Sequence, residues 1–130
     1  MNNFTITPAT ITGVTGQLVN VPVNVKDFLN VGAITLKLSY NTAVLDWVGT
    51  ENWDSQCPDA LANAVNGVVI IAWDGLNGVN IFDGKLVDLI FRYKEGSSLV
   101  SFIISECEIA NVQAKIIEMN YNDGAIQANT

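Results

Sequence analysis

Residues 67–75 read GVVIIAWDG, and this stretch decides the fold. Its six consecutive apolar residues predict a strand that is apolar on both faces, because alternate side chains of a strand point to opposite sides of a sheet. One set, Val69, Ile71 and Trp73, suits a core. The other set is Val68, Ile70 and Ala72. Either a loop or apolar neighbours cover this second set, or it forms an exposed strip of the kind that binds another protein.

The rest of the chain shows the same period of two with one polar face. Long alternating segments occupy residues 18–25, 33–40 and 85–93. Shorter strands fit residues 4–7, 45–48, 60–64, 99–104, 116–120 and 125–127, and residues 60–64 form a hairpin with 68–73. Asx-Gly pairs, which tolerate the positive φ of tight turns, punctuate the chain at Asn66-Gly67, Asp74-Gly75, Asn77-Gly78, Asp83-Gly84 and Asp123-Gly124.

This pattern predicts an all-β, two-sheet β-sandwich of about nine strands. We expect a single domain over residues 1–130, with a frayed tail at about 128–130. A single helical turn fits residues 42–45. The hydrophobic content of 49% and the charged content of 15% are typical of a chain with a packed core. The net charge of −7 argues against nucleic acid and anionic membranes as partners.

The sequence offers little for catalysis. It has no histidine, which removes Ser-His and Cys-His pairs and histidine metal sites. The acids lie where turns or outward strand positions want them, as for Asp88, and no D-x-D-x-D-G calcium loop occurs. Cys57 and Cys107 are fifty positions apart, and both a disulfide and two free thiols fit. We therefore predict no catalytic residue, no metal site and no enzyme activity.

The three tryptophans suggest an alternative function. Trp73 shares a face with Val69, and Trp47 follows Leu45, so both are expected in the core. Trp53 lies in the polar stretch 50–59 and is expected to be the most exposed of the three. An exposed ring can stack on a sugar, so a carbohydrate-binding module that binds polysaccharide is the alternative. A structural or adhesive surface domain is a third possibility.

The order of four segments resembles the cohesin domain, the receptor module of bacterial cellulosomes. These segments are LVNVPVNVKDFLNVGAITLKLSYNTAVLDWVG (18–49), GVVIIAWDG (67–75), FDGKLVDLIFRY (82–93) and EIANVQAKIIEMNYNDGAI (108–126). The resemblance covers residues 11–127. It implies a jelly-roll sandwich that catalyses nothing and binds a dockerin, a small calcium-loaded helical module on another protein. One flat sheet face would make this contact.

The resemblance and the alternation together predict the partner-binding residues. The resemblance implies Asn41, Ile70, Ala72, Asp74, Gly75 and Ala114, whereas the outward positions of residues 33–40 add Thr35, Lys37 and Ser39. At the position of Asn41 the family often has an aspartate that accepts hydrogen bonds from the dockerin. Here Tyr40-Asn41-Thr42 replaces the commoner Tyr-Asp-Pro. We also expect a module of a larger secreted or cell-surface protein, and we expect this chain to be a monomer. No cofactor is expected in this chain, and calcium is expected in the dockerin.

Overall fold

The computed structural model describes residues 4–128. This part of the chain contains strands and one short 3₁₀ helix, and none of its helices is long and apolar enough to cross a membrane. The strands are β1 (Thr5–Pro8), β2 (Thr10–Gly13), β3 (Leu18–Ser39), β4 (Leu45–Glu51), β5 (Leu61–Val65), β6 (Val68–Tyr93), β7 (Ser98–Phe102), β8 (Glu108–Asn111), β9 (Asn120–Tyr121) and β10 (Gly124–Ala128). The 3₁₀ helix η1 is Ile104–Glu106.

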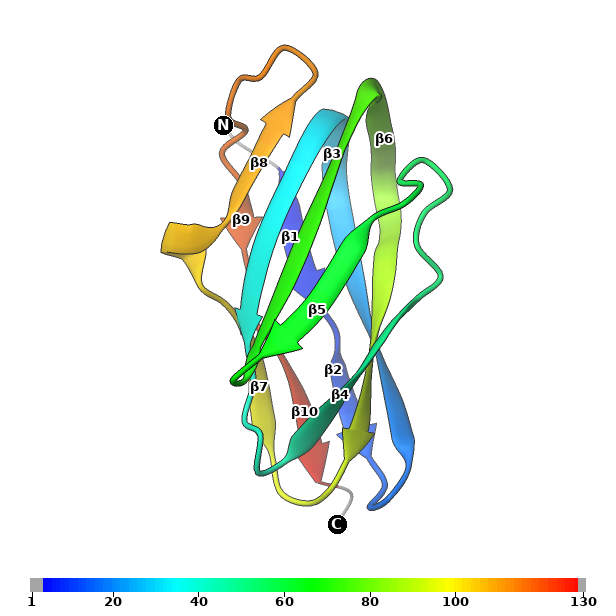
Figure 1. Cartoon of the computed structure of the whole chain (residues 1–130), viewed down its shortest axis with the longest axis vertical. Helices are drawn as coiled ribbons and strands as arrows, with labels where there is room; N and C mark the ends of the chain where they lie inside the picture. Colours follow the sequence, from blue (N-terminus) through cyan, green and yellow to red (C-terminus); the bar gives the residue numbers. More distant parts are fainter. Residues whose placement is uncertain (1–3, 129–130) are drawn as a thin grey trace.

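Two long strands, β3 and β6, organise the molecule (Figure 1). They pair antiparallel along their lengths, from Leu18 opposite Arg92 to Ser39 opposite Val68. The segments 18–25 and 33–40, predicted as separate strands, are the two halves of β3. Likewise 68–73 and 85–93 are the two halves of β6. Register shifts between Val23 and Ala33 mark the stretch between the two halves of β3.

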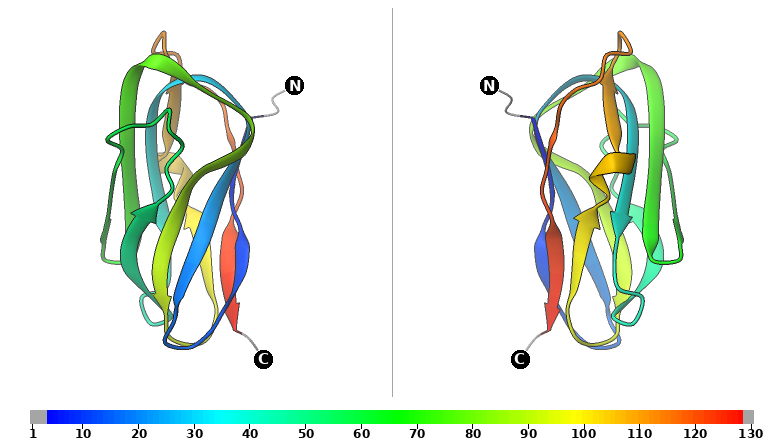
Figure 2. Two further views of the ribbon diagram at one scale, coloured as in Figure 1. Left: turned by 90° about the vertical axis from the view of Figure 1, so that its right-hand side faces the viewer. Right: turned by 90° about the vertical axis from the view of Figure 1, so that its left-hand side faces the viewer.

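The strands form the two layers of a sandwich (Figure 2). The first sheet contains β8, the second half of β3, the first half of β6, and β5. The second sheet contains β9, β1, the first half of β3, the second half of β6, and β4. Strands β7, β10 and β2 continue from the end of β3. This architecture confirms the predicted all-β sandwich with jelly-roll topology.

The core lies between the two layers and follows the predicted alternation. The inward residues of β3 and β6 are buried: Val19, Val21, Val23, Val25, Ile34, Leu36, Leu38, Val69, Ile71, Trp73, Val87, Leu89, Phe91 and Tyr93. Cys57 joins this core, and burial raises the pKa of its thiol to about 11. Both cysteines are free thiols, so of the two states that fit the sequence the structure shows the unbridged one.

Most of the predicted Asx-Gly turns are not turns. Gly75, Gly78 and Gly84 lie inside β6, Gly124 begins β10, and none has a positive φ. The exception is Asn66-Gly67, where φ is 52° and 80°, as a two-residue hairpin turn requires. The other glycines permit close packing instead. A Cβ on Gly124, for example, would lie 2.4 Å from the carbonyl oxygen of Pro8.

The outward side of the second half of β6 is buried rather than exposed. Asp88, predicted to face solvent, is only 4% exposed, and Leu86 and Ile90 are buried as well. The Asp88 carboxylate accepts hydrogen bonds from Lys85 Nζ at 3.0 Å and from Asn52 Nδ2 at 2.8 Å. These side chains close over it, so the charge is partnered inside the fold.

Three further expectations are corrected. Trp53, expected to be the most exposed tryptophan, is half-buried against the core, as is Trp47, and its indole donates to Thr50 Oγ1 at 3.0 Å. The segment 116–120 forms a single bridge, between Ile116 and Ala110, before the two-residue strand β9. Ala128 is paired within β10 rather than frayed, whereas residues 129–130 lie outside the described residues. The turn predicted at residues 42–45 is present.

Replacing Asp88 tests the buried carboxylate. We expect Asp88→Ala to lower the free energy of unfolding by about 1–3 kcal/mol, because Asn52 and Lys85 lose a shared acceptor. The matched control is Asp46→Ala, which removes an exposed ion pair with Lys94 at 2.9 Å and costs less than about 1 kcal/mol. Urea unfolding of both variants measures the difference. Equal losses would contradict the assignment.

Candidate functional site

Four neighbouring strands of the first sheet present an uncovered outer surface, which we call the open face. It consists of the outward residues of β8, the second half of β3, the first half of β6, and β5 (Figure 1). The register sets them in rows across the strands. These rows are Glu108, Thr35, Ala72 and Leu61; then Lys37, Ile70 and Asn63; then Ser39, Val68 and Val65.

The open face answers the question that residues 67–75 raised. Val68 and Ile70 are half-buried and Ala72 is exposed, so no segment of residues 4–128 lies over them. Two more apolar side chains of β5 flank this strip, with Leu61 71% and Val65 51% exposed. The second apolar set of the stretch therefore forms an exposed strip, while the first set fills the core.

Lys37 is tied to the β8 side of the open face. Its ammonium forms an exposed ion pair with Glu106 of η1, with Nζ and Oε1 2.9 Å apart. Its backbone N–H donates to Cys107 Sγ at 3.4 Å, and burial raises the pKa of that thiol. Exposed pairs of this kind contribute little to stability. The pair instead neutralises the one lysine of the predicted site.

Asn41 follows the end of β3 and organises the turn after it. Its side-chain Oδ1 accepts the N–H of Ala43 at 2.8 Å, and its backbone oxygen accepts from Val44 and Leu45. Its own N–H donates to Ser98 Oγ. The amide NH₂ group has no partner within residues 4–128. Asn41 therefore offers a donor at a position where an aspartate would offer an acceptor.

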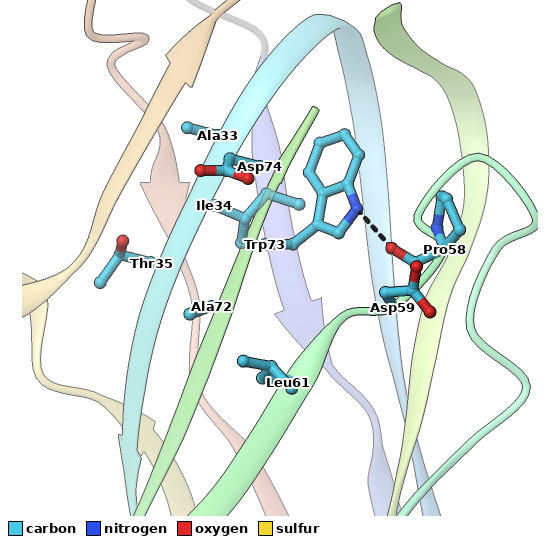
Figure 3. Close-up of a pocket in the computed structure, with 9 residues that line it drawn as sticks. All are labelled: Ala33, Ile34, Thr35, Pro58, Asp59, Leu61, Ala72, Trp73 and Asp74. Atoms are coloured by element: carbon cyan, nitrogen blue, oxygen red, sulfur yellow. Dashed lines mark hydrogen bonds between the residues drawn. The ribbon is translucent and has the colours of Figure 1, made fainter. Parts of the chain in front are cut away.

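A hollow of about 580 Å³ lies at the β5 side of the open face (Figure 3). Leu61 and Ala72 line it, and Asp59 and Asp74 stand at its sides. Both carboxylates are exposed, and neither forms an ion pair with another residue of the described chain. The hollow is thus apolar at its base and negatively charged at its rim.

The wall of this hollow is held in place by two polar contacts. The Trp73 indole donates to the carbonyl oxygen of Pro58 at 3.0 Å (Figure 3). The side-chain amide of Gln56 donates to the oxygen of Asn80 at 3.0 Å and accepts the N–H of Asn80 at 2.9 Å. This pair of bonds acts like a strand bridge and fixes the loop between β4 and β5 against β6.

A second hollow, of about 350 Å³, lies at the β8 side. Gly75 and Ala114, remote in sequence, both line it, together with Ala33, Ala110 and Ile116. Ala114 has a φ of 62°, a conformation that costs an L-residue energy. The Asn111 side chain supports it by accepting the N–H groups of Gln113 and Lys115.

The structure thus brings the predicted site residues onto one surface. Thr35, Lys37, Ser39, Ile70, Ala72 and Asp74 share the open face, Gly75 and Ala114 share the second hollow beside it, and Asn41 lies beyond Ser39. Sequence reasoning missed the β5 residues Leu61, Asn63 and Val65. Their alternation with Ala62 and Ala64 next to a predicted hairpin was the available signal.

A two-layer β-sandwich with an uncovered sheet face that carries an apolar strip among polar residues is typical of a protein-interaction module. A family model described as the Cohesin domain matches residues 4–128, so this chain belongs to the cohesin domain family. No curated protein matches the chain.

Solved structures share the fold. A non-cellulosomal cohesin from the archaeon Archaeoglobus fulgidus is 21% identical, with a TM-score of 0.84 over 98% of this chain and 91% of that one. The CaDoc0917–CaCohA2 complex, whose cohesin is from Clostridium acetobutylicum, gives 20% identity and a TM-score of 0.88 over 98% and 100%. A type I cohesin–dockerin complex from Clostridium thermocellum gives 13% and 0.84 over 98% and 100%.

Gly75→Ala tests the packing beside the first hollow. A Cβ on Gly75 would lie 2.7 Å from the Trp73 ring, so the indole must shift and lose its bond to Pro58. We expect the Trp73 indole N–H resonance to move and its hydrogen exchange to accelerate at least tenfold. The Trp53 indole, bonded to Thr50, is the internal control and should stay unchanged. An unmoved Trp73 resonance would contradict the packing.

Proposed function

We propose that this chain is a noncatalytic module that binds a dockerin-type partner through the open face. In this role it assembles a cellulosome-like or other complex, outside the cell or at its surface. The observation that carries the proposal is the uncovered apolar strip on the first sheet of a cohesin-family chain. Its support from known proteins is that several structures sharing the fold are cohesin–dockerin complexes.

The apolar strip supplies the attraction. Ile70, Val68 and Ala72 lie along the centre of the open face, and Leu61 and Val65 widen it toward β5. Removing one such side chain from water contributes roughly 1.5–3 kcal/mol when burial is complete. A centre of this kind with a polar rim has the composition of a protein-binding surface. The rigid sheet loses little conformational entropy when the partner binds.

The charges around the strip select the partner. Asp59 and Asp74 have no ion partner within residues 4–128, whereas Lys37 is already neutralised by Glu106. The open face therefore favours a partner with lysine or arginine near an apolar patch. The net charge of −7 steers such a partner during approach. Asn41 adds a hydrogen-bond donor, so the partner needs an acceptor there.

The calcium of the complex belongs to the partner in this proposal. Within residues 4–128 no group of three or more histidine, cysteine, aspartate or glutamate side chains is placed to hold a metal ion. The resemblance implies a dockerin that is a small helical module with calcium of its own. Calcium would then act on the shape of the partner, and the open face would need none.

Ile70→Asp tests the face assignment. A charge at the centre of the strip should weaken binding to a dockerin panel at least a hundredfold, measured by calorimetry. The melting temperature should stay within about 3 °C, because Ile70 lies outside the core. Leu18→Asp makes the same change at a 51% exposed residue outside the open face and should bind normally. Normal binding by Ile70→Asp would place the contact elsewhere.

Chelation tests where the calcium acts. EDTA should abolish binding by unfolding the dockerin loops, while the melting temperature of this chain alone stays the same. Returning calcium should restore the complex. A drop in the melting temperature of this chain in EDTA would instead show that it holds a metal of its own.

A further inference from the structure

The two edges of the open face differ in how they end. At the β8 edge the chain folds back: Ile117 N–H donates to the oxygen of Ile109 at 2.7 Å, and Asn111 N–H donates to the oxygen of Lys115 at 2.9 Å. These bonds cover the outer side of β8. At the other edge β5 pairs with β6 alone. No described segment pairs with its outer side.

The hairpin geometry decides which backbone groups of β5 are left unpaired. A two-residue turn at Asn66-Gly67 makes Val65 and Val68 a hydrogen-bonded pair. The N–H and C=O groups of Leu61, Asn63 and Val65 therefore point to β6. Those of Ala62 and Ala64 point away from it, and no hydrogen bond within residues 4–128 uses them.

Nothing in the sequence of β5 blocks a further strand. Natural edge strands are protected by charge, proline or a bulge. β5 reads LANAV, without charge or proline, and its register with β6 has no shift. By contrast β4, an edge strand of the second sheet, carries Asp46 and Glu51.

The residues of β5 complement a second, antiparallel copy of themselves. With Asn63 opposite Asn63 of the other copy, Leu61 lies opposite Val65, and Ala62 opposite Ala64. The two alanine pairs then exchange the backbone hydrogen bonds that each strand alone leaves unmade. On the outer side, Leu61 and Val65, which are 71% and 51% exposed, cover each other. No charged side chain is buried by this pairing.

We propose that β5 is a self-association edge through which two copies of this chain pair antiparallel. The two-fold axis passes between the two Asn63 residues perpendicular to the sheet, so the two open faces join in one continuous sheet and point the same way. This departs from the monomer expected from the sequence and does not depend on dockerin binding. Each copy carries a net charge of −7, so salt should strengthen the pairing by screening this repulsion.

Sedimentation equilibrium of the whole chain, from about 10 μM to about 1 mM protein, tests the proposal. The weight-average mass should rise from 14.0 kDa toward twice that value, and further at higher salt. Ala64→Pro removes an outward N–H while leaving the bonds to β6, and should weaken association at least tenfold. Ala64→Ser keeps the N–H and should associate as the unchanged chain does.

Hydrogen exchange of the unchanged chain provides a readout that needs no variant. The Ala62 and Ala64 amides should exchange more slowly as protein concentration rises, whereas the Asn63 amide, already bonded to β6, should not respond. A mass of 14.0 kDa at every concentration would overturn the proposal. So would association that Ala64→Pro leaves intact and Ile70→Asp abolishes, because the copies would then meet through the open face.

Discussion

The antiparallel pairing of β3 with β6 is the constraint on which the rest of the structure depends. Both strands run through the two sheets, so one register fixes which side chains enter the core in each layer. A slip of one residue would send Ile34, Leu36 and Leu38 outward and bring Thr35 and Lys37 into the core. The large apolar burial of the correct register excludes this slip. The same register fixes the open face, because its residues on β3 and β6 alternate with these core residues along the strands.

The loop between β4 and β5 shows how the sheets constrain irregular chain. Gln56 pairs with the backbone of Asn80, Pro58 accepts the Trp73 indole, and Cys57 is buried between them. The conformation of the loop is therefore fixed by its contacts with β6. This loop carries Asp59 to the edge of the first hollow. The position of that charge is therefore fixed by the bonds between the loop and β6. A surface set in this way needs little rearrangement when a partner arrives.

The sequence predicts the parts of this molecule that depend on a period of two. The inward sets of β3 and β6, the hairpin at Asn66-Gly67 and the outward strip at Val68, Ile70 and Ala72 all follow from alternation. Long-range packing decides what alternation cannot. Asx-Gly pairs predict turns locally, yet Gly75 lies in β6, where a Cβ would lie 2.7 Å from the Trp73 ring. Asp88 alternates outward, yet Lys85 of the same strand and Asn52, which follows β4, enclose it.

The site was predictable to a similar degree and for the same reason. Residues on β3 and β6 follow from alternation. Leu61 and Val65 could have been found in the same way, because the hairpin that pairs β5 with β6 was predicted and both residues alternate with Ala62 and Ala64. The resemblance places Asn41 in the site, but the turn after β3 decides which of its groups is available. Its side-chain oxygen accepts the N–H of Ala43, so its amide NH₂ is left to donate to a partner. Knowing that a residue occupies a family position therefore does not tell whether its side chain donates or accepts a hydrogen bond there.

An uncovered apolar face and an open strand edge are both hazards for a chain that must stay in solution. Here the negative charge counters them. With a net charge of −7, two copies repel one another at a distance, so random apolar collisions are slowed, while a positively charged partner is drawn toward the carboxylates beside the strip. The same charge weakens a contact between two copies more at low salt than at high salt, because salt screens their repulsion. Binding of a basic partner is instead stronger at low salt, because salt screens the attraction. Electrostatics therefore separates the two proposed uses of the first sheet. The open face favours a basic partner, whereas the edge of β5 has no charged residue, so two copies can meet there without charge repulsion at the contact itself.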